Sequence, residues 1–490
     1  MNEICLRTDL YELTMAEGYW SEGMSGRRAV FYLFFRRNPF DGGFAVAAGI
    51  EPALDFIENL RFDASSLEYL ASLRGSDGRP LFRDGFLAHL AEFEPNVDVH
   101  AVPEGTVVFP QEPILRVEGP ILACQILETL LLNAVNFATL IATKAARIVG
   151  AAGERPVIEF GLRRAQGPDG GLSASRAAYI GGVAATSNLE AGRRWGIPVR
   201  GTQAHSWIMA HGDERVAFQA WAHALPGAAV FLVDTYDSLT GVRHAIEAGR
   251  RLRKGGGDLA GIRLDSGDLA WLATQARKLL DESGFENTRI IASNDLDEET
   301  ITSLVDQEAP IDAFGVGTRL VTGWGDPALT GVYKLSAIRS ADGLSWEPRI
   351  KLSEQTAKVT IPGRLQVRRF ENEGGTYVAD MIFDEDSPPQ DASADEIVHP
   401  ADPLRRRRLD DAANFRDLLS LVIRRGRRVG APEGVEDIRE RCRSDLARLD
   451  PAIRRLRFPH EFPAGLEPSL HERRLALIAR ARERLEEGGV

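Results

Sequence analysis

The chain has 490 residues, of which 44% are hydrophobic and 27% are charged, and its formal net charge is −12. Because this length exceeds one ordinary hydrophobic core, we expect two or more domains. The acidic balance argues against a nucleic-acid-binding protein, which normally carries a basic surface. Cys5, Cys124 and Cys442 show no metal or redox spacing and indicate reduced thiols in a cytoplasm.

Residues 1–140 predict an α/β domain. Helical spacing near the amino terminus is followed by the apolar strand AVFYLFFRR (29–37). Runs of β-forming residues broken by Pro and Gly at 97–120 predict an antiparallel sheet. The apolar stretch 121–142 predicts a buried helix and no membrane span, because polar side chains interrupt it at Gln125, Glu128, Asn133 and Asn136.

Residues 141–334 predict an irregular β/α barrel, because short apolar runs alternate there with amphipathic helical stretches. The runs are VIEFGLRRAQG (157–167), VRGTQAHS (199–206), VFLVDTYDS (230–238), IRLDSGDL (262–269), IIASNDLDEET (290–300) and AFGVGTRLVT (313–322). In such a barrel the ligand lies at the carboxyl ends of the strands. The acidic and glycine-rich ends of these runs suit a phosphorylated sugar, so we expect an enzyme.

The last part of the chain predicts more strands and then helices. Strand-like runs at about 335–385 could complete the sheet of the first domain, which would then be discontinuous. Beyond residue 400, helical spacing at 414–426 and in two later segments predicts a helical, arginine-rich C-terminal region at 400–490. The run Arg405–Arg408 is expected to be a solvated charged stretch rather than a phosphate site.

His205 is the candidate nucleophile or base. It lies on the same predicted barrel face as four carboxylates, those of Asp234, Asp237, Asp265 and Asp268. A carboxylate bonded to one ring nitrogen would fix the tautomer and leave the other nitrogen reactive. Asp265 could accept from ribose hydroxyls or bind Mg²⁺, with Asp234 as a second metal contact. Asp268 and Asp297 are expected only to cap helices.

Further residues at the strand ends suit anions and hydroxyl groups. Gly315, Gly317 and Thr318 could let backbone N–H groups approach a phosphate. Asn294 and Asp295, on the preceding strand end, could bind hydroxyls beside that phosphate.

The loop at 161–171 and two aromatic residues could also contact a ligand. Arg163 and Arg164 could clamp an anion, although a surface loop with solvated arginines is the alternative. Phe160 and Tyr11 are aromatic faces that could hold a flat ligand.

Six motifs together resemble the nicotinate phosphoribosyltransferase family. They are YELTM (11–15), EFGLRRAQGPDG (159–170), GTQAHS (201–206), RLDSGDL (263–269), SNDLDE (293–298) and GVGTRLVT (315–322). The resemblance implies an ATP-dependent enzyme of the ligase class that acts in NAD salvage. It would join nicotinic acid to 5-phosphoribosyl 1-diphosphate, giving nicotinate mononucleotide and pyrophosphate. The resemblance also implies a transient phosphohistidine, a requirement for Mg²⁺, and a homodimer with shared active sites.

The resemblance assigns roles to the residues that bind the sugar and its phosphates. His205 matches the phosphorylated histidine, and Asp265 resembles the ribose or metal contact. Gly317 and Thr318 look like the cradle of the 5-phosphate.

The resemblance also assigns roles around the pyridine ring. Tyr11 and Phe160 resemble the two aromatics that sandwich the ring, and Tyr11 is expected from the partner subunit. Thr202 and Arg263 look like nicotinate contacts, and Arg163 is a further anion-binding candidate.

Ser187 predicts a preference for the acid over the amide. The related nicotinamide-specific enzyme carries an aspartate at this position, and a buried carboxylate facing the nicotinate carboxylate would be strongly unfavourable. The alternatives are a nicotinamide- or quinolinate-type phosphoribosyltransferase, or a non-catalytic phosphate-binding or scaffolding protein. A Schiff-base lyase is disfavoured because no lysine lies at the predicted strand ends.

Overall fold

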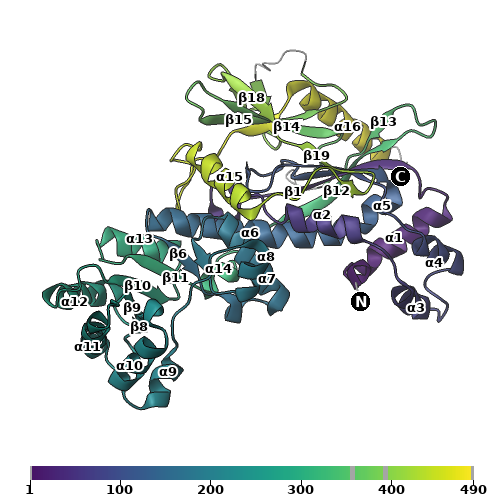
Figure 1. Ribbon diagram of the computed structural model, residues 1–490. Coiled ribbons are helices and arrows are strands. Elements are labelled where there is room, and N and C mark those ends of the chain that lie inside the picture. Colours follow the sequence, from purple (N-terminus) through teal and green to yellow (C-terminus); the bar gives the residue numbers. More distant parts are fainter. Residues whose placement is uncertain (1–2, 354–358, 390–395, 487–490) are drawn as a thin grey trace. The chain divides into compact units, whose positions relative to one another are not determined.

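The computed structural model describes residues 3–353, 359–389 and 396–486, which form a mixed α/β fold (Figure 1). The chain divides into two compact units, one made of residues 1–140 and 328–490 and the other of residues 141–327. The first boundary falls within the long helix α6 (Glu128–Ala152). Except for Tyr11, all the site residues carried over from the family resemblance belong to the unit at 141–327.

The first unit contains an antiparallel sheet in the order β13-β12-β1-β5-β3-β19-β20. In β1 (Arg28–Phe35) every residue after Arg28 is buried, so both faces of this strand are covered. Although β12 (Gly331–Arg339) lies late in the chain, it pairs with β1, with Ala29 opposite Ile338. The other strands are β3 (Asp98–Ala101), β5 (Leu115–Pro120), β13 (Trp346–Pro348), β19 (Ser420–Arg424) and β20 (Arg427–Arg428).

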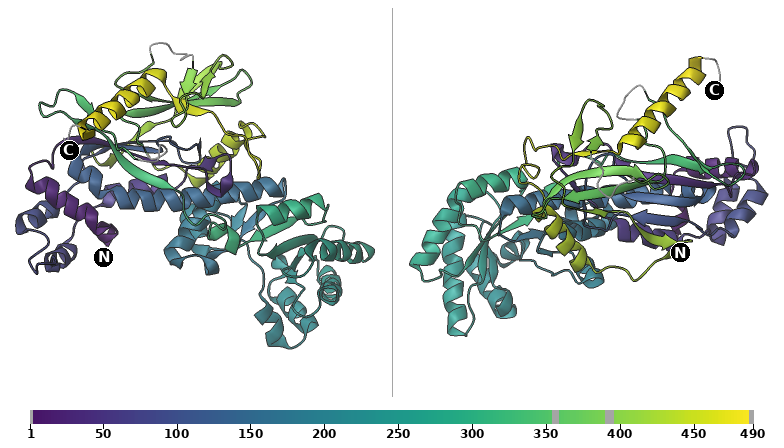
Figure 2. Two further views of the ribbon diagram at one scale, coloured as in Figure 1. Left: turned by 180° about the vertical axis from the view of Figure 1, so that it is seen from behind. Right: turned by 90° about the horizontal axis from the view of Figure 1, so that it is seen from above.

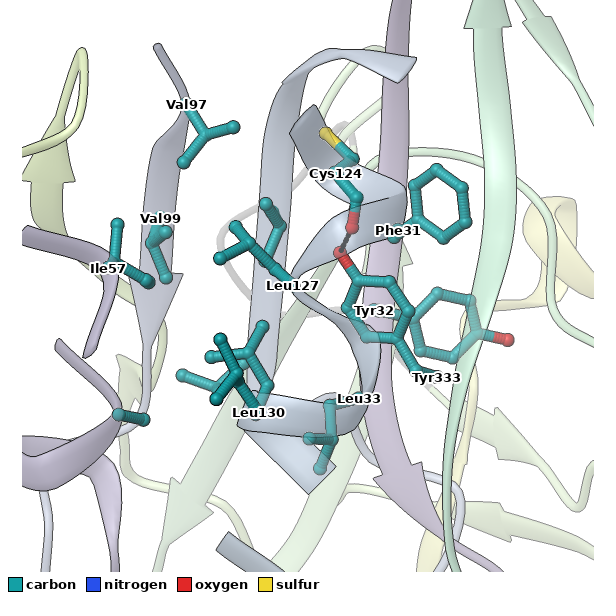
Figure 3. Close-up of a cluster of buried hydrophobic side chains, with 14 of the residues drawn as sticks. Phe31, Tyr32, Leu33, Ile57, Val97, Val99, Cys124, Leu127, Leu130 and Tyr333 are labelled. Atoms are coloured by element: carbon teal, nitrogen blue, oxygen red, sulfur yellow. Dashed lines mark hydrogen bonds between the residues drawn. The ribbon is translucent and has the colours of Figure 1, made fainter. Parts of the chain in front are cut away.

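Aromatic residues of the central strands form part of the core of this unit. Figure 3 shows Phe31 of β1 and Tyr333 of β12, whose rings stack with centroids 5.0 Å apart. The Tyr333 hydroxyl donates to the Cys124 carbonyl oxygen at 2.9 Å, so this buried phenol is satisfied. Helices of the unit are α1 (Leu10–Ser21), α2 (Ile50–Asn59), α3 (Ala64–Ser72), α4 (Asp84–Ala91) and α5 (Ile121–Ile126).

The helical segment Ile121–Ala152 is long and apolar enough to cross a membrane by length and composition alone. However, 61% of its most apolar window is buried inside the protein. Such burial is typical of a core helix, as the polar interruptions of the sequence predict.

A second sheet of the first unit has the order β17-β16-β21-β15-β14-β18. Its long central hairpin is β14 (Leu365–Glu371) and β15 (Tyr377–Asp384), which pair antiparallel. The shorter strands are β16 (Glu396–Val398), β17 (Arg406–Arg408), β18 (Asn414–Asp417) and β21 (Ala464–Leu466). Arg405–Arg408 make exposed ion pairs with nearby carboxylates, as predicted for a solvated stretch.

The expectation of a helix at 414–426 is wrong. The segment forms β18, which pairs with β14, and β19, which pairs with β3. Its leucine spacing fits a helix, but pairing with two existing strands outweighs this local preference. Helices begin only later, at α15 (Val435–Ala447) and at α16 (Pro468–Glu486), the yellow helix near the C terminus in Figure 2. The C-terminal region is therefore mixed α/β rather than helical.

The second unit contains a parallel sheet in the order β7-β6-β11-β10-β9-β8. Its strands are β6 (Val157–Glu159), β7 (Ala185–Thr186), β8 (Val230–Leu232), β9 (Gly261–Leu264), β10 (Arg289–Asn294) and β11 (Ala313–Val316). The last strand, β11, pairs with the first, β6, as in a barrel. However, the ring of strands does not close within the described part of this unit. Val199 forms a single bridge to Thr186 of β7, and no strand pairing connects Val199 to β8.

The predicted strand at 199–206 is wrong, because only Val199 forms a bridge there. Pro198 precedes this residue and cannot donate to a ladder, and α9 (His205–His211) begins shortly afterwards. The two-residue strand β7, and not the segment 199–206, pairs with β6. The connecting helices are α7 (Gly167–Ile180), α8 (Leu189–Trp195), α10 (Glu214–Ala224), α11 (Ser238–Lys254), α12 (Leu269–Glu282), α13 (Glu298–Asp306) and α14 (Thr318–Val321).

Candidate active site

Arg263 connects three segments of the second unit. It lies on β9, and its side chain is 14% exposed. Its Nε donates to Ser293 Oγ at 2.7 Å, its Nη1 to Thr202 Oγ1 at 3.0 Å and its Nη2 to Asp265 Oδ1 at 2.7 Å. Because these bonds leave the guanidinium in three directions, they fix its orientation. A positive charge is therefore held at the carboxyl end of the sheet.

Asp265 follows β9 and provides a fixed negative charge beside Arg263. Its Oδ1 also accepts from Ser293 Oγ at 2.5 Å. Burial alone would raise the pKa of Asp265, but the Ser293 hydrogen bond, the charge and hydrogen bond of Arg263 and the charge of His205 together lower it. The carboxylate is therefore ionised at neutral pH and can accept from a hydroxyl or bind a cation.

His205 is the first residue of α9, and its side chain is 41% exposed. Its Nδ1 lies 3.1 Å from Thr235 Oγ1, and its Nε2 lies 3.8 Å from Asp265 Oδ2. The second distance is too long for a hydrogen bond. The expectation that a carboxylate is bonded to the ring is therefore wrong, because a threonine hydroxyl takes that place.

Asp234 follows β8 and supports the loop that carries Asp265. Its Oδ2 accepts from the Asp265 backbone N–H at 2.9 Å and from Ser266 Oγ at 2.6 Å. Its Oδ1 is buried and has no hydrogen-bond partner within the described residues. A buried carboxylate oxygen without a partner is unfavourable unless a ligand or cation completes it.

The carboxylates fit a magnesium ion that is shared with a substrate. The described residues contain no group of three or more His, Cys, Asp or Glu side chains that could enclose a metal. Mg²⁺ is usually bound by one or two carboxylates together with phosphate oxygens and water. The free oxygen of Asp234 and the ionised Asp265 match that kind of donor set.

A cavity of about 200 Å³ opens beside Arg263 and Asp265. It is lined by residues from four segments: Phe160, Arg163, Arg164, Arg263, Asp265, Ser293, Asn294, Asp295, Gly315, Gly317 and Thr318. The structure thus brings together the predicted aromatic, cationic, hydroxyl-binding and phosphate-binding candidates of the second unit.

Phe160 and Gly315 form one wall of this cavity. The Arg263 guanidinium carbon lies 5.4 Å from the centre of the Phe160 ring. A Cβ atom on Gly315 would lie 2.7 Å from two atoms of the same ring. A side chain at position 315 would therefore collide with the Phe160 ring in this position.

Asn294 ends β10 with a backbone φ of 130°, in a region that residues other than glycine rarely adopt. Its Oδ1 accepts from the Asp295 backbone N–H at 2.8 Å. Strain of this kind often occurs at functional sites. Here it places two consecutive polar residues on the cavity lining.

Glu159, which the sequence did not single out, holds the backbone next to Phe160 and next to Ser187. It is fully buried and accepts from the Gly161 backbone N–H, from Ser175 Oγ at 3.0 Å and from Thr186 Oγ1 at 2.5 Å. The Ser187 backbone N–H in turn donates to the Glu159 carbonyl oxygen at 2.9 Å. The network therefore holds the neighbours of Phe160 and Ser187.

Other predicted residues lie outside this cluster. Asp268 and Asp297 cap α12 and α13, as predicted, but Asp297 also pairs with Arg319. Asp237, which the sequence grouped with the carboxylates near His205, caps α11. Tyr11 lies on α1 of the first unit and is 45% exposed. Burial, followed by the charge of Glu128, raises the pKa of its phenol, so this side chain is neutral.

Comparisons with known proteins identify relatives over nearly the whole chain. The N-terminal domain of nicotinate phosphoribosyltransferase matches residues 6–136, the family model matches residues 156–360 and the C-terminal domain matches residues 364–474. The nicotinate phosphoribosyltransferase of Bacillus subtilis is 41% identical, with 99% of this chain and 97% of that protein covered.

Two further relatives agree with this result. A nicotinate phosphoribosyltransferase of Mycobacterium tuberculosis is 46% identical over 77% of this chain and 78% of its own length. The crystal structure of human nicotinic acid phosphoribosyltransferase superimposes with a TM-score of 0.81 at 33% identity, covering 96% of this chain and 99% of that chain.

Proposed function

We propose, from the premise that this chain belongs to the nicotinate phosphoribosyltransferase family, that the cluster around Arg263 is its active site. The family reaction joins nicotinate to 5-phosphoribosyl 1-diphosphate and gives nicotinate mononucleotide and pyrophosphate in NAD biosynthesis. The observation that carries the proposal is the fixed Arg263–Asp265 pair at the mouth of a cavity with an aromatic wall. We further propose that the parallel sheet is an incomplete β/α barrel.

Nicotinate would bind with its ring against Phe160 and its carboxylate near Arg263 and Thr202. Arg263 already donates to Thr202 and holds a full positive charge close to the Phe160 ring. Arg163, also on the cavity lining, would add a second cation. Tyr11 would cover the other face of the ring from the partner subunit of a homodimer.

The phosphoribosyl group would occupy the opposite part of the cavity. Asp265, Asn294 and Asp295 offer acceptors for ribose hydroxyls, and Gly317 and Thr318 would contact the 5-phosphate. Asp234 and Asp265 would hold Mg²⁺, which neutralises diphosphate charge when it is bound.

Ser187 supports the choice of nicotinate over nicotinamide. Its backbone N–H donates to the carbonyl oxygen of Glu159, the residue that precedes Phe160. A neutral hydroxyl there does not repel the substrate carboxylate, whereas an aspartate would.

In the transfer step the pyridine nitrogen attacks the anomeric carbon while pyrophosphate leaves. The transition state has oxocarbenium character, so the protein need not form a covalent bond to the sugar. Phe160 and Arg263 hold the ring in place, and the Asp265 carboxylate lies where it can stabilise the developing positive charge. Positioning and fixed charges of this kind supply most of the rate in such reactions.

ATP would enter through His205. Its imidazole is accessible and lies beside Asp265, so a phosphoryl group on the ring would adjoin the diphosphate site. Phosphorylation would raise the affinity for the diphosphate substrate and couple ATP hydrolysis to nucleotide formation. The expected location of the enzyme is the cytoplasm.

A chromatographic product assay tests this function. The purified protein is incubated with 5-phosphoribosyl 1-diphosphate, Mg²⁺ and either nicotinate or nicotinamide, with and without ATP. We expect nicotinate mononucleotide as the main product and a higher yield with ATP. His205→Ala should abolish nicotinate-stimulated ATP hydrolysis and retain slow ATP-independent transfer. Equal use of nicotinamide would refute the substrate assignment, and unchanged ATP coupling in the variant would refute the role of His205.

A further inference from the structure

We propose that Glu159 is a positioning residue for nicotinate binding, because its buried carboxylate holds the turn that presents Phe160, Arg163 and Arg164 to the cavity. This inference rests on the proposed function, since it takes Phe160 and Arg163 as contacts of the pyridine ring and its carboxylate. It adds a residue that does not line the cavity and yet controls how well nicotinate is bound.

The Glu159 carboxylate is surrounded by neutral hydrogen-bond donors. Glu159, Ser175 and Thr186 are each 0% exposed. Oε1 of Glu159 accepts from the Gly161 backbone N–H, and Oε2 accepts from Ser175 Oγ at 3.0 Å and from Thr186 Oγ1 at 2.5 Å. A buried carboxylate is unfavourable unless hydrogen bonds satisfy it. The three donors therefore fix where this carboxylate lies.

The bond to Gly161 holds the backbone directly after Phe160. The Phe160 N–H donates to the Val316 carbonyl oxygen of β11 at 2.8 Å, so this residue is held on both sides. A Cβ atom on Gly161 would lie 3.0 Å from Glu159 Oε1 and 2.2 Å from Val321 Cγ1. Because residue 161 has no side chain, the carboxylate and α14 can pack closely against this turn.

The same turn begins the short helix that carries the two arginines. The 3₁₀ helix η3 (Leu162–Arg164) follows Gly161 directly, and the Gly161 carbonyl oxygen accepts from the Arg164 N–H at 2.7 Å. Arg163 and Arg164 line the cavity together with Phe160. A shift of Gly161 would therefore move the aromatic wall and both cations at once.

The other side of this network is anchored away from the turn. Ser175 lies on α7 and Thr186 on β7. Asn188 connects the two, since its Nδ2 donates to Ser175 Oγ at 3.1 Å and its backbone N–H to Thr186 Oγ1 at 3.0 Å. None of these three residues belongs to the cavity lining. The Glu159 carboxylate thus ties the turn to α7 and β7.

The contacts proposed for the phosphoribosyl group lie on other segments. Asp265, Asn294, Gly317 and Thr318 follow or end β9, β10 and β11. A displaced turn should therefore raise KM for nicotinate more than KM for 5-phosphoribosyl 1-diphosphate. A loss of folded enzyme would instead lower the apparent kcat and leave both KM values unchanged. The two KM values consequently separate a positioning role from a merely structural one.

Three substitutions separate the reach of the Glu159 side chain from its charge. Glu159→Asp keeps the charge but withdraws the acceptors by one methylene, and Glu159→Met keeps the length without acceptors. Glu159→Gln keeps the length and an acceptor for the Gly161 N–H. Its amide can donate to Ser175 Oγ, whose proton can turn to the Gly171 carbonyl oxygen at 3.0 Å.

Glu214→Met is the matched control. Glu214 is a buried glutamate of α10 in the same unit, and it pairs with His244 outside the cavity lining. For each full-length variant, kcat and KM are measured for both substrates with Mg²⁺ and saturating ATP. Amide hydrogen exchange of the segment 157–165 reports on the turn independently of activity, and thermal unfolding checks that each variant is folded.

We expect Glu159→Asp and Glu159→Met to raise KM for nicotinate about tenfold, with KM for 5-phosphoribosyl 1-diphosphate within about threefold of the native value. Segment 157–165 should exchange faster in both. Glu159→Gln and Glu214→Met should keep both KM values within about threefold of the native ones.

Glu159→Asp decides the inference even if Glu159→Met does not fold. A folded Glu159→Asp enzyme with the native KM for nicotinate would overturn the inference and leave the proposed function standing. A Glu159→Gln enzyme as impaired as Glu159→Asp would also overturn it, because charge rather than reach would then matter. A native protein that forms no nicotinate mononucleotide would overturn both the inference and the proposed function.

Discussion

Asp265 Oδ2 lies 3.8 Å from His205 Nε2, while Oδ1 of the same carboxylate accepts from Arg263 and Ser293. One side chain thus connects the predicted nicotinate contact with the predicted phosphohistidine, although the two lie on different segments of the second unit. The ionisation of Asp265 should therefore govern the acid side of the pH–rate profile.

Ser293→Ala removes the hydrogen bond that contributes most to lowering the pKa of Asp265. An aspartate with a lowered pKa remains ionised, and therefore active, until the pH falls through that pKa. The variant should lose kcat/KM at a higher pH than the native enzyme, with a shift of up to about one pH unit. Steady-state measurements of kcat/KM between about pH 4 and 8, at intervals of ~0.5 pH unit, would show this shift of the acid limb. Ser303→Ala, an exposed serine of α13, is the control, and an unshifted acid limb in Ser293→Ala would contradict the prediction.

Ser187→Asp should weaken the use of nicotinate. The new carboxylate would face the substrate carboxylate beside the Glu159 network, and its burial without a cation is unfavourable. We expect kcat/KM for nicotinate to fall by at least about 100-fold, and the ratio of nicotinamide to nicotinate use to rise. Competition assays with both substrates would show this. Ser187→Ala, which adds no charge, should retain the preference for nicotinate, and an unchanged preference in Ser187→Asp would be evidence against the assignment.

Gly315→Ala should displace the Phe160 ring. The added Cβ would lie 2.7 Å from ring atoms, closer than carbon atoms approach without movement. We expect KM for nicotinate to rise about tenfold with a smaller change in the KM for 5-phosphoribosyl 1-diphosphate. Gly170→Ala is the control, because a Cβ there has no neighbour within 4 Å. A variant with both constants unchanged would show that Phe160 does not bind the ring.

Glu112 should make the stability of the first unit depend on pH. This side chain is 1% exposed. Burial and then the charge of Asp380 raise its pKa well above the usual range, against the opposing effect of Arg369. The folded form therefore holds a proton there, and this contribution to stability is complete below the unfolded pKa and is lost as the pH rises through the folded pKa.

Glu112→Gln keeps the shape of the neutral acid and has no proton to lose. Its free energy of unfolding should be close to that of the native protein at about pH 5 and exceed it at about pH 9. Urea unfolding at several pH values would measure both. A native protein that gains stability relative to Glu112→Gln as the pH rises would contradict the prediction, since it would mean that Glu112 is ionised in the folded state.

The sequence predicted that the strand ends converge, but it did not predict the hydrogen bonds that hold their side chains in place. Arg263, Asp265 and Asn294 each lie at or just after the end of a strand whose apolar run is visible in the sequence, so parallel pairing alone gathers them at one edge. His205 instead begins α9, and strand pairing does not place it. Small hydroxyl residues after strands are too common to single out. Ser293 and Thr235 were therefore missed, although they bond to Arg263, Asp265 and His205.

Elements that depend on distant partners were also hard to predict. β7 has only two residues and exists because β6 pairs with it. The strands β18 and β19 lie in a segment with helical spacing, and their partners β14 and β3 are remote in the chain. Glu159 was not singled out because its role appears only when Ser175 and Thr186 lie beside it.

Arg263→Gln, measured by kcat/KM for nicotinate, tests most directly whether the cluster around Arg263 is the site of phosphoribosyl transfer. The matched control is Arg253→Gln on α11, an arginine paired with Asp258 at the surface. We predict a loss of at least about 100-fold for Arg263→Gln and a change of less than about twofold for the control, with both variants folded. A folded Arg263→Gln enzyme that uses nicotinate at the native rate would contradict this placement of the active site.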